Sequence, residues 1–148
     1  MNFNDEVRML SFIIKAAENF CIHQIRLPYR IEPLYSQKRT LIAYLDIEDS
    51  NGDKHRAYIG CDTILLQCIT EIFLGEEIYD QETLRDMLLE TTNMIVGNAK
   101  VLYEESSTIP FTISTPHFQA NEHFTIDTEV SHTFYVADGE MLIALKAL

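Results

Sequence analysis

The stretch LRDMLLETTNMIVGNAK, residues 84–100, decides the fold of this chain and carries its most informative polar residues. Its apolar residues recur every three to four positions, which predicts an amphipathic helix. With about 100° per residue and Asp86 at zero, Glu90 falls at about 40°, Asn93 at about −20° and Gly97 at about 20°. The opposite side of the helix, between about 140° and 220°, carries Leu84, Leu88, Thr91, Ile95, Ala99 and Leu102. We therefore expect this second face in the core and the polar face toward solvent or a partner.

The polar face combines two side chains of complementary chemistry. Glu90 and Asn93 are three residues apart, so they are neighbours on the helix surface. The carboxylate of Glu90 pairs with a cation, whereas the amide of Asn93 both donates and accepts and can hold a water molecule. Gly97 costs about 1 kcal/mol relative to alanine inside a helix, and its missing side chain leaves room for a close approach. Taken alone, these residues favour the simpler alternative, a solvated helix face.

The chain before residue 84 predicts one helix, an extended segment, a hairpin and a second helix. We expect a helix over 4–20 capped by Asn4 or Asp5, an extended segment over 26–34, strands over 39–48 and 54–60, and a helix between Asp62 and Gly75. The two prolines of residues 26–34 exclude a helix there and suit an edge strand. Asn51-Gly52 lies between the two strands and predicts a tight hairpin turn. The helix after Asp62 has both an N-cap carboxylate and a C-terminal glycine.

The chain from Asp80 onward predicts the long helix, over about 81–103, and then only β-structure. We expect strands over 109–116, 121–127, 128–136 and 140–147, with a second hairpin turn at Asp138-Gly139. Helices on one face of a mostly antiparallel sheet fit this order of elements, an α+β two-layer sandwich. At 148 residues the chain has the length of one domain, and we expect residues 1–148 to form it.

Composition limits the classes of function. The net charge of −12 and the pI near 4.7 argue against binding to nucleic acid or to an anionic membrane. The first residues, MNFNDEVRML, lack a signal-peptide pattern, and no apolar run approaches the roughly 20 residues of a membrane span. We therefore expect a cytoplasmic protein. Neither the three cysteines nor the five histidines have metal-ligand spacing, so we expect no metal site; Cys61 and Cys68, seven apart, fit buried free thiols in an apolar helical pattern.

One set of residues resembles a known family. Asp86, Glu90, Asn93 and Pro116 match, at the family's spacing, the signature of the CheC/CheX/FliY family of chemotaxis phosphatases. Gly97-Asn98 and the short ISTP segment before the next β segment are also similar to the family. CheC and FliY carry two copies of the motif and this chain carries one, so the resemblance is closest to CheX. Outside residues 86–116 the match is one of element order and length.

The resemblance implies a specific activity and a partner. Members of this family dephosphorylate the response regulator CheY, whose own active site supplies Mg²⁺ and a lysine, so no cofactor of the chain's own is expected. By resemblance, Asn93 would place the attacking water and Glu90 would pair with the regulator's lysine, which is catalysis by positioning. Asp86 and Pro116 would serve docking or shape.

The resemblance also implies a homodimer formed by joining sheets edge to edge. The prolines of residues 26–34 could blunt one sheet edge, and the alternating C-terminal hairpin could offer another. Two other functions stay open at this point. One is a non-catalytic adaptor or sink that binds a response regulator, related to the flagellar switch proteins. The other, a small-molecule binding fold, has only the generic α+β pattern behind it.

Overall fold

A single antiparallel sheet with helices on one face forms the described part of the chain. The computed structural model describes residues 3–33, 39–77, 79–106, 110–123 and 130–148. Its helices are α1 (Phe3–Asn19), the π-helix η1 (Phe20–Ile25), α2 (Thr63–Leu74) and α3 (Gln81–Ser106). Its strands are β1 (Tyr29–Glu32), β2 (Arg39–Asp49), β3 (Lys54–Cys61), β4 (Phe111–Ile113), β5 (His117–His123), β6 (Val130–Val136) and β7 (Gly139–Ala147).

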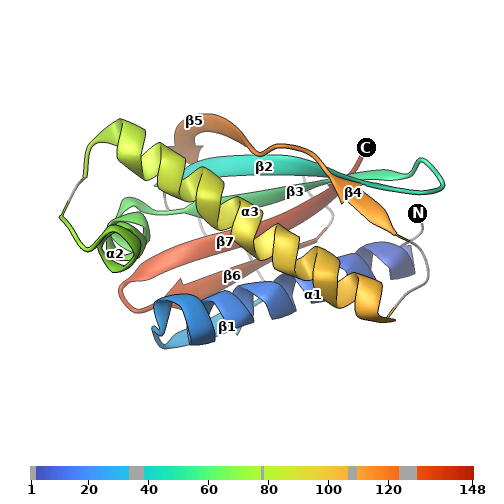
Figure 1. Ribbon diagram of the computed structural model, residues 1–148, viewed down its shortest axis with the longest axis horizontal. Coiled ribbons are helices and arrows are strands. Elements are labelled where there is room, and N and C mark those ends of the chain that lie inside the picture. Colours follow the sequence, from blue (N-terminus) through green and yellow to red (C-terminus); the bar gives the residue numbers. More distant parts are fainter. Residues whose placement is uncertain (1–2, 34–38, 78, 107–109, 124–129) are drawn as a thin grey trace.

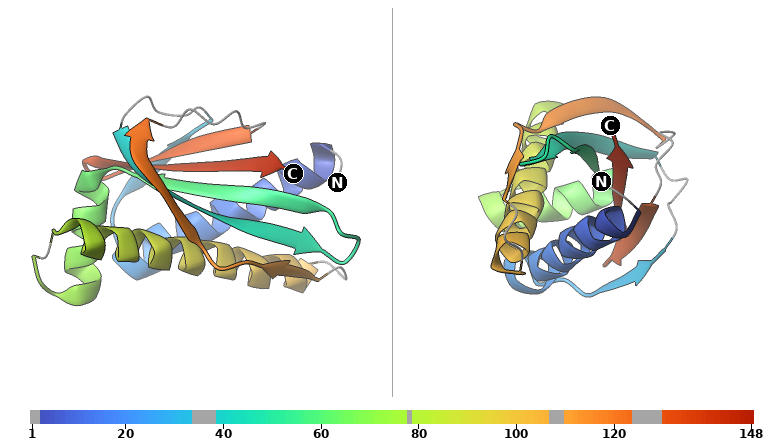
Figure 2. Two further views of the ribbon diagram at one scale, coloured as in Figure 1. Left: turned by 90° about the horizontal axis from the view of Figure 1, so that it is seen from above. Right: turned by 90° about the vertical axis from the view of Figure 1, so that its right-hand side faces the viewer.

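The seven strands pair in the order β1-β6-β7-β3-β2-β4, and β5 also pairs with β2. Every strand pairing is antiparallel. Helices α1 and α3 lie side by side across one face of the sheet, and α2 lies at one end (Figures 1 and 2). The predicted fold class, a two-layer α+β sandwich with helices on one face, is confirmed.

Helix α3 buries the face that the sequence pattern selects. Its innermost side chains are at most 1% exposed, and they are Leu84, Leu88, Thr91, Ile95 and Ala99. Leu102, the last predicted member of this face, is half-buried. Each fully buried leucine or isoleucine contributes about 1.5–3 kcal/mol through its removal from water. The apolar face thus fixes the rotation of α3 about its own axis.

Local hydrogen bonds set both ends of α2, as predicted, and they also set the start of α3. The Oδ1 atom of Asp62 accepts from the backbone N–H of Leu65 at 2.9 Å, which caps the start of α2. Gly75 ends α2 in the left-handed conformation with φ +70°. Asp80 accepts from the backbone N–H of Thr83 at 3.1 Å and from its hydroxyl at 2.7 Å, so it caps the start of α3.

The first helix continues further than predicted. The chain stays helical beyond residue 20 as the π-helix η1, which ends at Arg26 with φ +55°. Phe20, Cys21 and Ile25 are buried, and the five-residue spacing from Phe20 to Ile25 matches the i→i+5 pattern of a π-helix. The predicted boundary was wrong because an α-helical spacing would not bring these residues to the core together.

Two predicted strands have different boundaries. The strand predicted over 109–116 is limited to Phe111–Ile113, and β5 begins at His117, four residues before the predicted start of 121–127. Residues 107–109 and 124–129 lie outside the described part. Pro116 has no N–H to donate to a ladder, so the edge breaks there into two short strands that lie end to end along β2.

The two hairpins form where expected, but both turns are displaced by one residue. In the first turn the N–H of Gly52 donates to the carbonyl oxygen of Asp49 at 3.1 Å, so the central residues are Ser50 and Asn51 rather than Asn51 and Gly52, and Gly52 follows them with φ +87°. In the second hairpin Val136 pairs with Gly139, so the turn is Ala137-Asp138 rather than Asp138-Gly139. Both strands of this C-terminal hairpin also have a second neighbour in the sheet. The expectation that the hairpin offers a free edge was therefore wrong.

Gly139 has a packing role instead of a turn role. A Cβ atom at this position would lie 2.7 Å from the Cβ of Leu65 and 2.9 Å from the Oδ1 of Asp62. Both neighbours belong to the start of α2, which therefore rests directly on the backbone of β7. Only glycine permits this approach.

The three cysteines are free thiols, as predicted, but not in one helix. Cys61 ends β3 rather than lying in a helix, and it is buried like Cys21; Cys68 is half-buried on α2. Burial, with a smaller effect of the nearby Glu18 carboxylate, raises the pKa of Cys21 to about 12. A thiol with such a pKa is not a nucleophile near neutral pH.

We predict opposite effects of alanine at two glycines. Gly139→Ala should lower the free energy of unfolding by about 1–3 kcal/mol, because the added methyl group overlaps the start of α2. Gly97→Ala serves as the matched control, because its Cβ would meet no atom within 4 Å and alanine gains up to about 1 kcal/mol inside a helix. Urea denaturation measures both variants. Equal stability of Gly139→Ala and the wild type would contradict this account of the α2–β7 contact.

Candidate functional site

The polar face of α3 is exposed and its side chains have no partner within the described part of the chain. Asp86, Glu90 and Asn93 are exposed. None of the three side chains makes a hydrogen bond or an ion pair with another described residue. Gly97 continues this face with open space above it. The prediction that Asp86, Glu90 and Asn93 lie opposite the core is confirmed, and we call these three residues with Gly97 the polar stripe.

The polar stripe is held from beneath and from one side. Leu88, Thr91 and Ile95, on the opposite face of the same turns of α3, are fully buried in the core. The Nδ2 of Asn19, the last residue of α1, donates to the Oδ1 of Asn98 at 3.2 Å. This bond joins the two helices beside Gly97. The backbone that carries Glu90 and Asn93 is therefore braced by the core and by α1.

Pro116 lies on the other flank of α3, at the break between β4 and β5, and is half-buried. The backbone N–H of Ser114 donates to the carbonyl oxygen of Asp46 at 2.9 Å, and the N–H of Asp46 donates to the Oγ of Ser114 at 2.8 Å. The guanidinium of Arg85 lies 4.5 Å from the ring centroid of Phe118. This cation–π contact joins α3, next to Asp86, to β5, two residues after Pro116.

An ion pair strengthens the strand beside Pro116. Arg56 binds Asp46 through two hydrogen bonds of 2.7 and 3.0 Å, and its guanidinium lies 4.3 Å from the ring centroid of Tyr44. These hydrogen bonds from Arg56 hold the pKa of Asp46 below its usual range. His117 is exposed and its ring lies 5.4 Å from that of Tyr44.

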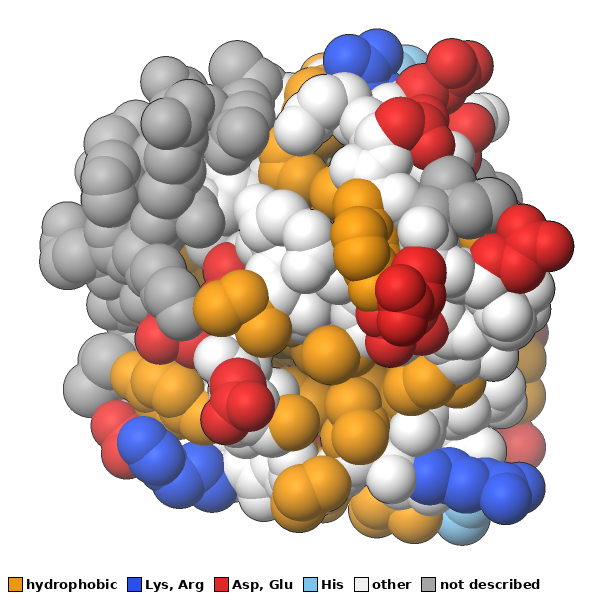
Figure 3. Space-filling model, turned by 90° about the vertical axis from the view of Figure 1, so that its left-hand side faces the viewer, with side chains coloured by type: hydrophobic (Ala, Val, Ile, Leu, Met, Phe, Trp, Pro, Cys, Tyr) orange, Lys and Arg blue, Asp and Glu red, His pale blue; other side chains and the backbone are white. Residues whose placement is uncertain are grey.

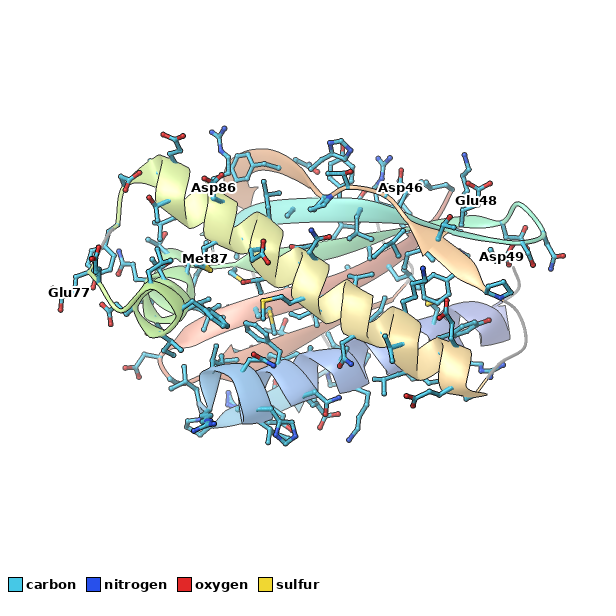
Figure 4. The ribbon with its side chains drawn as sticks, in the orientation of Figure 1. Asp46, Glu48, Asp49, Glu77, Asp86 and Met87 are labelled. Atoms are coloured by element: carbon cyan, nitrogen blue, oxygen red, sulfur yellow. The ribbon has the colours of Figure 1, made fainter. Side chains whose placement is uncertain are left out.

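Two surface hollows flank the polar stripe, and the sequence pattern did not reveal them. The α1–α3 hollow, of about 360 Å³, lies between the end of α1, η1 and α3, and its lining includes Phe20 and Met94. The α2–α3 hollow, of about 320 Å³, is lined by Leu74, Thr83, Asp86, Met87 and Glu90. Figure 4 shows Met87 on the side of α3 that faces α2. The signal that could have located them is the seven-residue spacing of Met87 and Met94, two helical turns apart.

Two other kinds of feature are absent from the described part of the chain. Within the residues that the structure describes, no three His, Cys, Asp or Glu side chains form a group that could hold a metal ion. Among those residues, no helix is both long enough and apolar enough to span a bilayer. The polar stripe with Pro116 and the two hollows therefore make up the candidate site.

Comparison with known families gives a match that contains the polar stripe, Pro116 and the α2–α3 hollow, but not the part of the α1–α3 hollow formed by α1 and η1. The family model of the chemotaxis phosphatase CheX matches residues 47–140, more than half of the chain. The chain belongs to the CheX family. The matched region includes Asp86, Glu90, Asn93, Gly97 and Pro116. No curated protein sequence is significantly similar to the chain.

Solved structures share the CheX fold at low sequence identity. The chemotaxis protein CheX from Vibrio vulnificus is 20% identical, with a TM-score of 0.79, over 95% of this chain and 99% of that protein. CheX in the CheX–CheY–BeF₃–Mg²⁺ complex from Borrelia burgdorferi is 17% identical, with a TM-score of 0.70, over 93% and 97% of the two chains. The middle domain of FliM from Vibrio alginolyticus is 11% identical, with a TM-score of 0.53, over 94% and 90%. The fold of the CheX family is therefore shared with the FliM middle domain, and function must be argued from the site.

Proposed function

We propose that residues 1–148 act as one CheX-like domain that dephosphorylates the phospho-aspartate of a CheY-like response regulator. The observation that carries the proposal is the exposed pair of Glu90 and Asn93, which lies on a braced helix and has no partner among the described residues. Membership of the chemotaxis phosphatase family supports the proposal. So does the complex of the Borrelia burgdorferi CheX with CheY and beryllofluoride, a group that stands in for the phosphoryl group.

In the proposed mechanism this chain contributes position rather than acid–base chemistry. The Asn93 amide accepts from the attacking water with its oxygen and orients it in line with the phosphorus. Glu90 pairs with the regulator's lysine, which fixes the two proteins relative to each other. Asn93 cannot act as a base, so the rate gain comes from orientation of the water, as with the glutamine of a GTPase. The regulator's own active site would supply the Mg²⁺ that neutralises charge on the phosphoryl group, and the proposal requires no cofactor bound to this chain.

Three further residues have docking roles in this proposal. Gly97 lies one turn after Asn93, and the open space above it lets the partner's backbone come close to α3. Asp86 precedes Glu90 by one turn and extends the acidic contact. Pro116 shapes the break between β4 and β5, and this break borders the same face of α3.

A second candidate function is a binder without turnover, either an adaptor or a sink for the phosphorylated regulator. The fold shared with the FliM middle domain favours it, because that likeness does not depend on catalysis. The presence of both Glu90 and Asn93 favours the enzyme, since a binder has no need for a side chain that orients water.

We predict that Asn93→Ala lowers the rate of phosphate release from a phosphorylated regulator by about 10²-fold or more, since the loss of an orienting group costs that much. Glu90→Ala should weaken regulator binding and also lower the rate. Release of phosphate is followed with regulators from the same genome, in excess over the enzyme. Glu105→Ala is the control, because Glu105 is exposed on the last turn of the same helix. Wild-type activity that persists in Asn93→Ala would contradict the mechanism.

Gly97→Ala should separate stability from activity. The variant is expected to be at least as stable as the wild type, because nothing lies within 4 Å of the added methyl group. Its KM for the phosphorylated regulator should nevertheless rise several-fold, because the methyl group occupies the space proposed for the partner. Thermal melts and steady-state kinetics on one preparation test both parts. An unchanged KM would remove Gly97 from the docking surface.

We also propose that the protein forms a homodimer by extension of its sheet. Of the two ends of the sheet, the β1 end has four residues between Pro28 and Pro33, and short proline-flanked strands resist pairing. The other end is formed by β4, of three residues, and β5, of seven residues, which both pair with β2 on their inner side. Strand β5 is therefore the better edge for a second copy of the chain.

A proline scan of the two edges tests this dimer. Gln119→Pro in β5 should convert a dimer of twice 17.1 kDa into a monomer, because proline removes a ladder donor. Arg30→Pro in β1 is the matched control and should remain dimeric. Sedimentation velocity reports the mass, and circular dichroism verifies that each variant is folded. A wild-type protein that is monomeric at all concentrations tested would refute the proposal.

A further inference from the structure

The two hollows beside α3 are linked by apolar contacts into one furrow. Phe20 in the wall of the α1–α3 hollow packs against Phe73 of α2, with ring centroids 6.1 Å apart. The next residue, Leu74, lines the α2–α3 hollow. Met87 and Met94 line one hollow each and lie on the same side of α3, two turns apart. We use the term furrow for the surface formed by these five residues.

The furrow and its border expose large apolar side chains to solvent. Phe73 is 37% exposed, Leu74 is 47% exposed and the adjacent Ile72 is 42% exposed. Figure 3 looks onto this end of the molecule and shows apolar side chains gathered in the middle of the face, with acidic side chains among and around them. A clustered apolar surface with a polar border is typical of a protein interaction site.

The border of the furrow is acidic. Glu71, Glu76 and Glu77 line a shallow hollow around the end of α2, and Figure 4 shows Glu77 on the loop at that end. Glu71 accepts a hydrogen bond from Tyr79. Asp86 and Glu90 add two further carboxylates in the wall of the furrow itself. A partner that carries lysine or arginine around an apolar centre complements this pattern.

The acidic border also disfavours a second copy of this chain as the occupant. A two-fold dimer places the same patch on both sides of the interface, so it would bring the glutamates of both copies together. The net charge of −12 adds to that repulsion. An occupant of opposite charge has no such cost.

We propose that the furrow is the docking groove that selects the partner of the Glu90–Asn93 site. Its occupant is a surface segment of the phosphorylated response regulator, with apolar side chains flanked by lysine or arginine, beside the regulator's phosphorylation site. The inference rests on the proposed function. Glu90 belongs both to the proposed catalytic pair and to the lining of the α2–α3 hollow, so a protein that contacts Glu90 lies directly beside Leu74 and Met87 of the furrow. Flexible methionines at both hollows let the groove adapt to its occupant.

The test is a binding titration with a CheY-type regulator from the same genome, loaded with Mg²⁺ and beryllofluoride. Leu74→Asp should bind about tenfold or more weakly, which corresponds to about 1.4 kcal/mol. Ile64→Asp is the matched control, because Ile64 lies on the same helix, is 45% exposed and lines neither hollow; its affinity should stay within twofold of the wild type. In turnover assays Leu74→Asp should raise KM and leave kcat unchanged, because it removes contact area rather than a reacting group.

A charge reversal provides a second test that does not alter the apolar surface. Glu77→Lys should lower the association rate constant several-fold at low ionic strength, and the difference should disappear at high salt. Because Glu77 is exposed on the loop between α2 and α3, this variant should fold normally. Wild-type association kinetics in Glu77→Lys, together with wild-type affinity in Leu74→Asp, would overturn the proposal.

The outcomes separate this inference from the proposed function. If the wild type binds the loaded regulator without turnover and Leu74→Asp does not bind it, the furrow stands and the phosphatase proposal fails. If turnover occurs and Leu74→Asp has an unchanged KM, the phosphatase stands and the furrow proposal fails. Loss of self-association in Leu74→Asp with unchanged regulator affinity assigns the furrow to a second copy. A wild type that binds none of the loaded regulators overturns both proposals.

Discussion

The structure depends on the burial of one face of α3 against the sheet. Leu84, Leu88 and Ile95 are at most 1% exposed, and their loss of contact with water fixes the rotation of the 26-residue helix. Once that rotation is fixed, Glu90 and Asn93 must face outward. A rotation large enough to hide them would bury an unpaired carboxylate, which is far more costly than any local gain in packing. The same interaction therefore stabilises the fold and presents the candidate site.

The features that could be predicted from sequence are those set within a few residues. Asp62, Gly75 and Asp80 fix helix ends through bonds to residues three or four positions away, and such bonds are visible in the sequence as cap signals. The exposure of the polar stripe follows from the helical period alone. The proposed roles of these residues do not follow from the helical period, because they come from the resemblance to the family.

The features that could not be predicted depend on contacts between distant parts of the chain. Gly139 resembles a turn residue in the sequence, yet glycine is required there because Leu65 of α2 leaves no room for a Cβ atom. The π-helical turn at Phe20 forms where its apolar residues reach the core, next to Phe73 of α2. The break at Pro116 depends on Ser114 binding β2. The furrow is formed by η1, α2 and α3, so the spacing of Met87 and Met94 marks only its α3 side, and the other side depends on contacts between distant parts of the chain.

The polar stripe and the furrow differ in the free energy that each can supply to a complex. An exposed ion pair contributes about 0–1 kcal/mol, so Glu90 and Asn93 alone would hold a partner only weakly. Apolar surface contributes roughly 25 cal/mol per Å² removed from water, and the exposed parts of Phe73 and Leu74 offer such surface directly beside the stripe. We infer a division of roles in which the furrow supplies affinity and selects the partner, while Asn93 is free to act on the water.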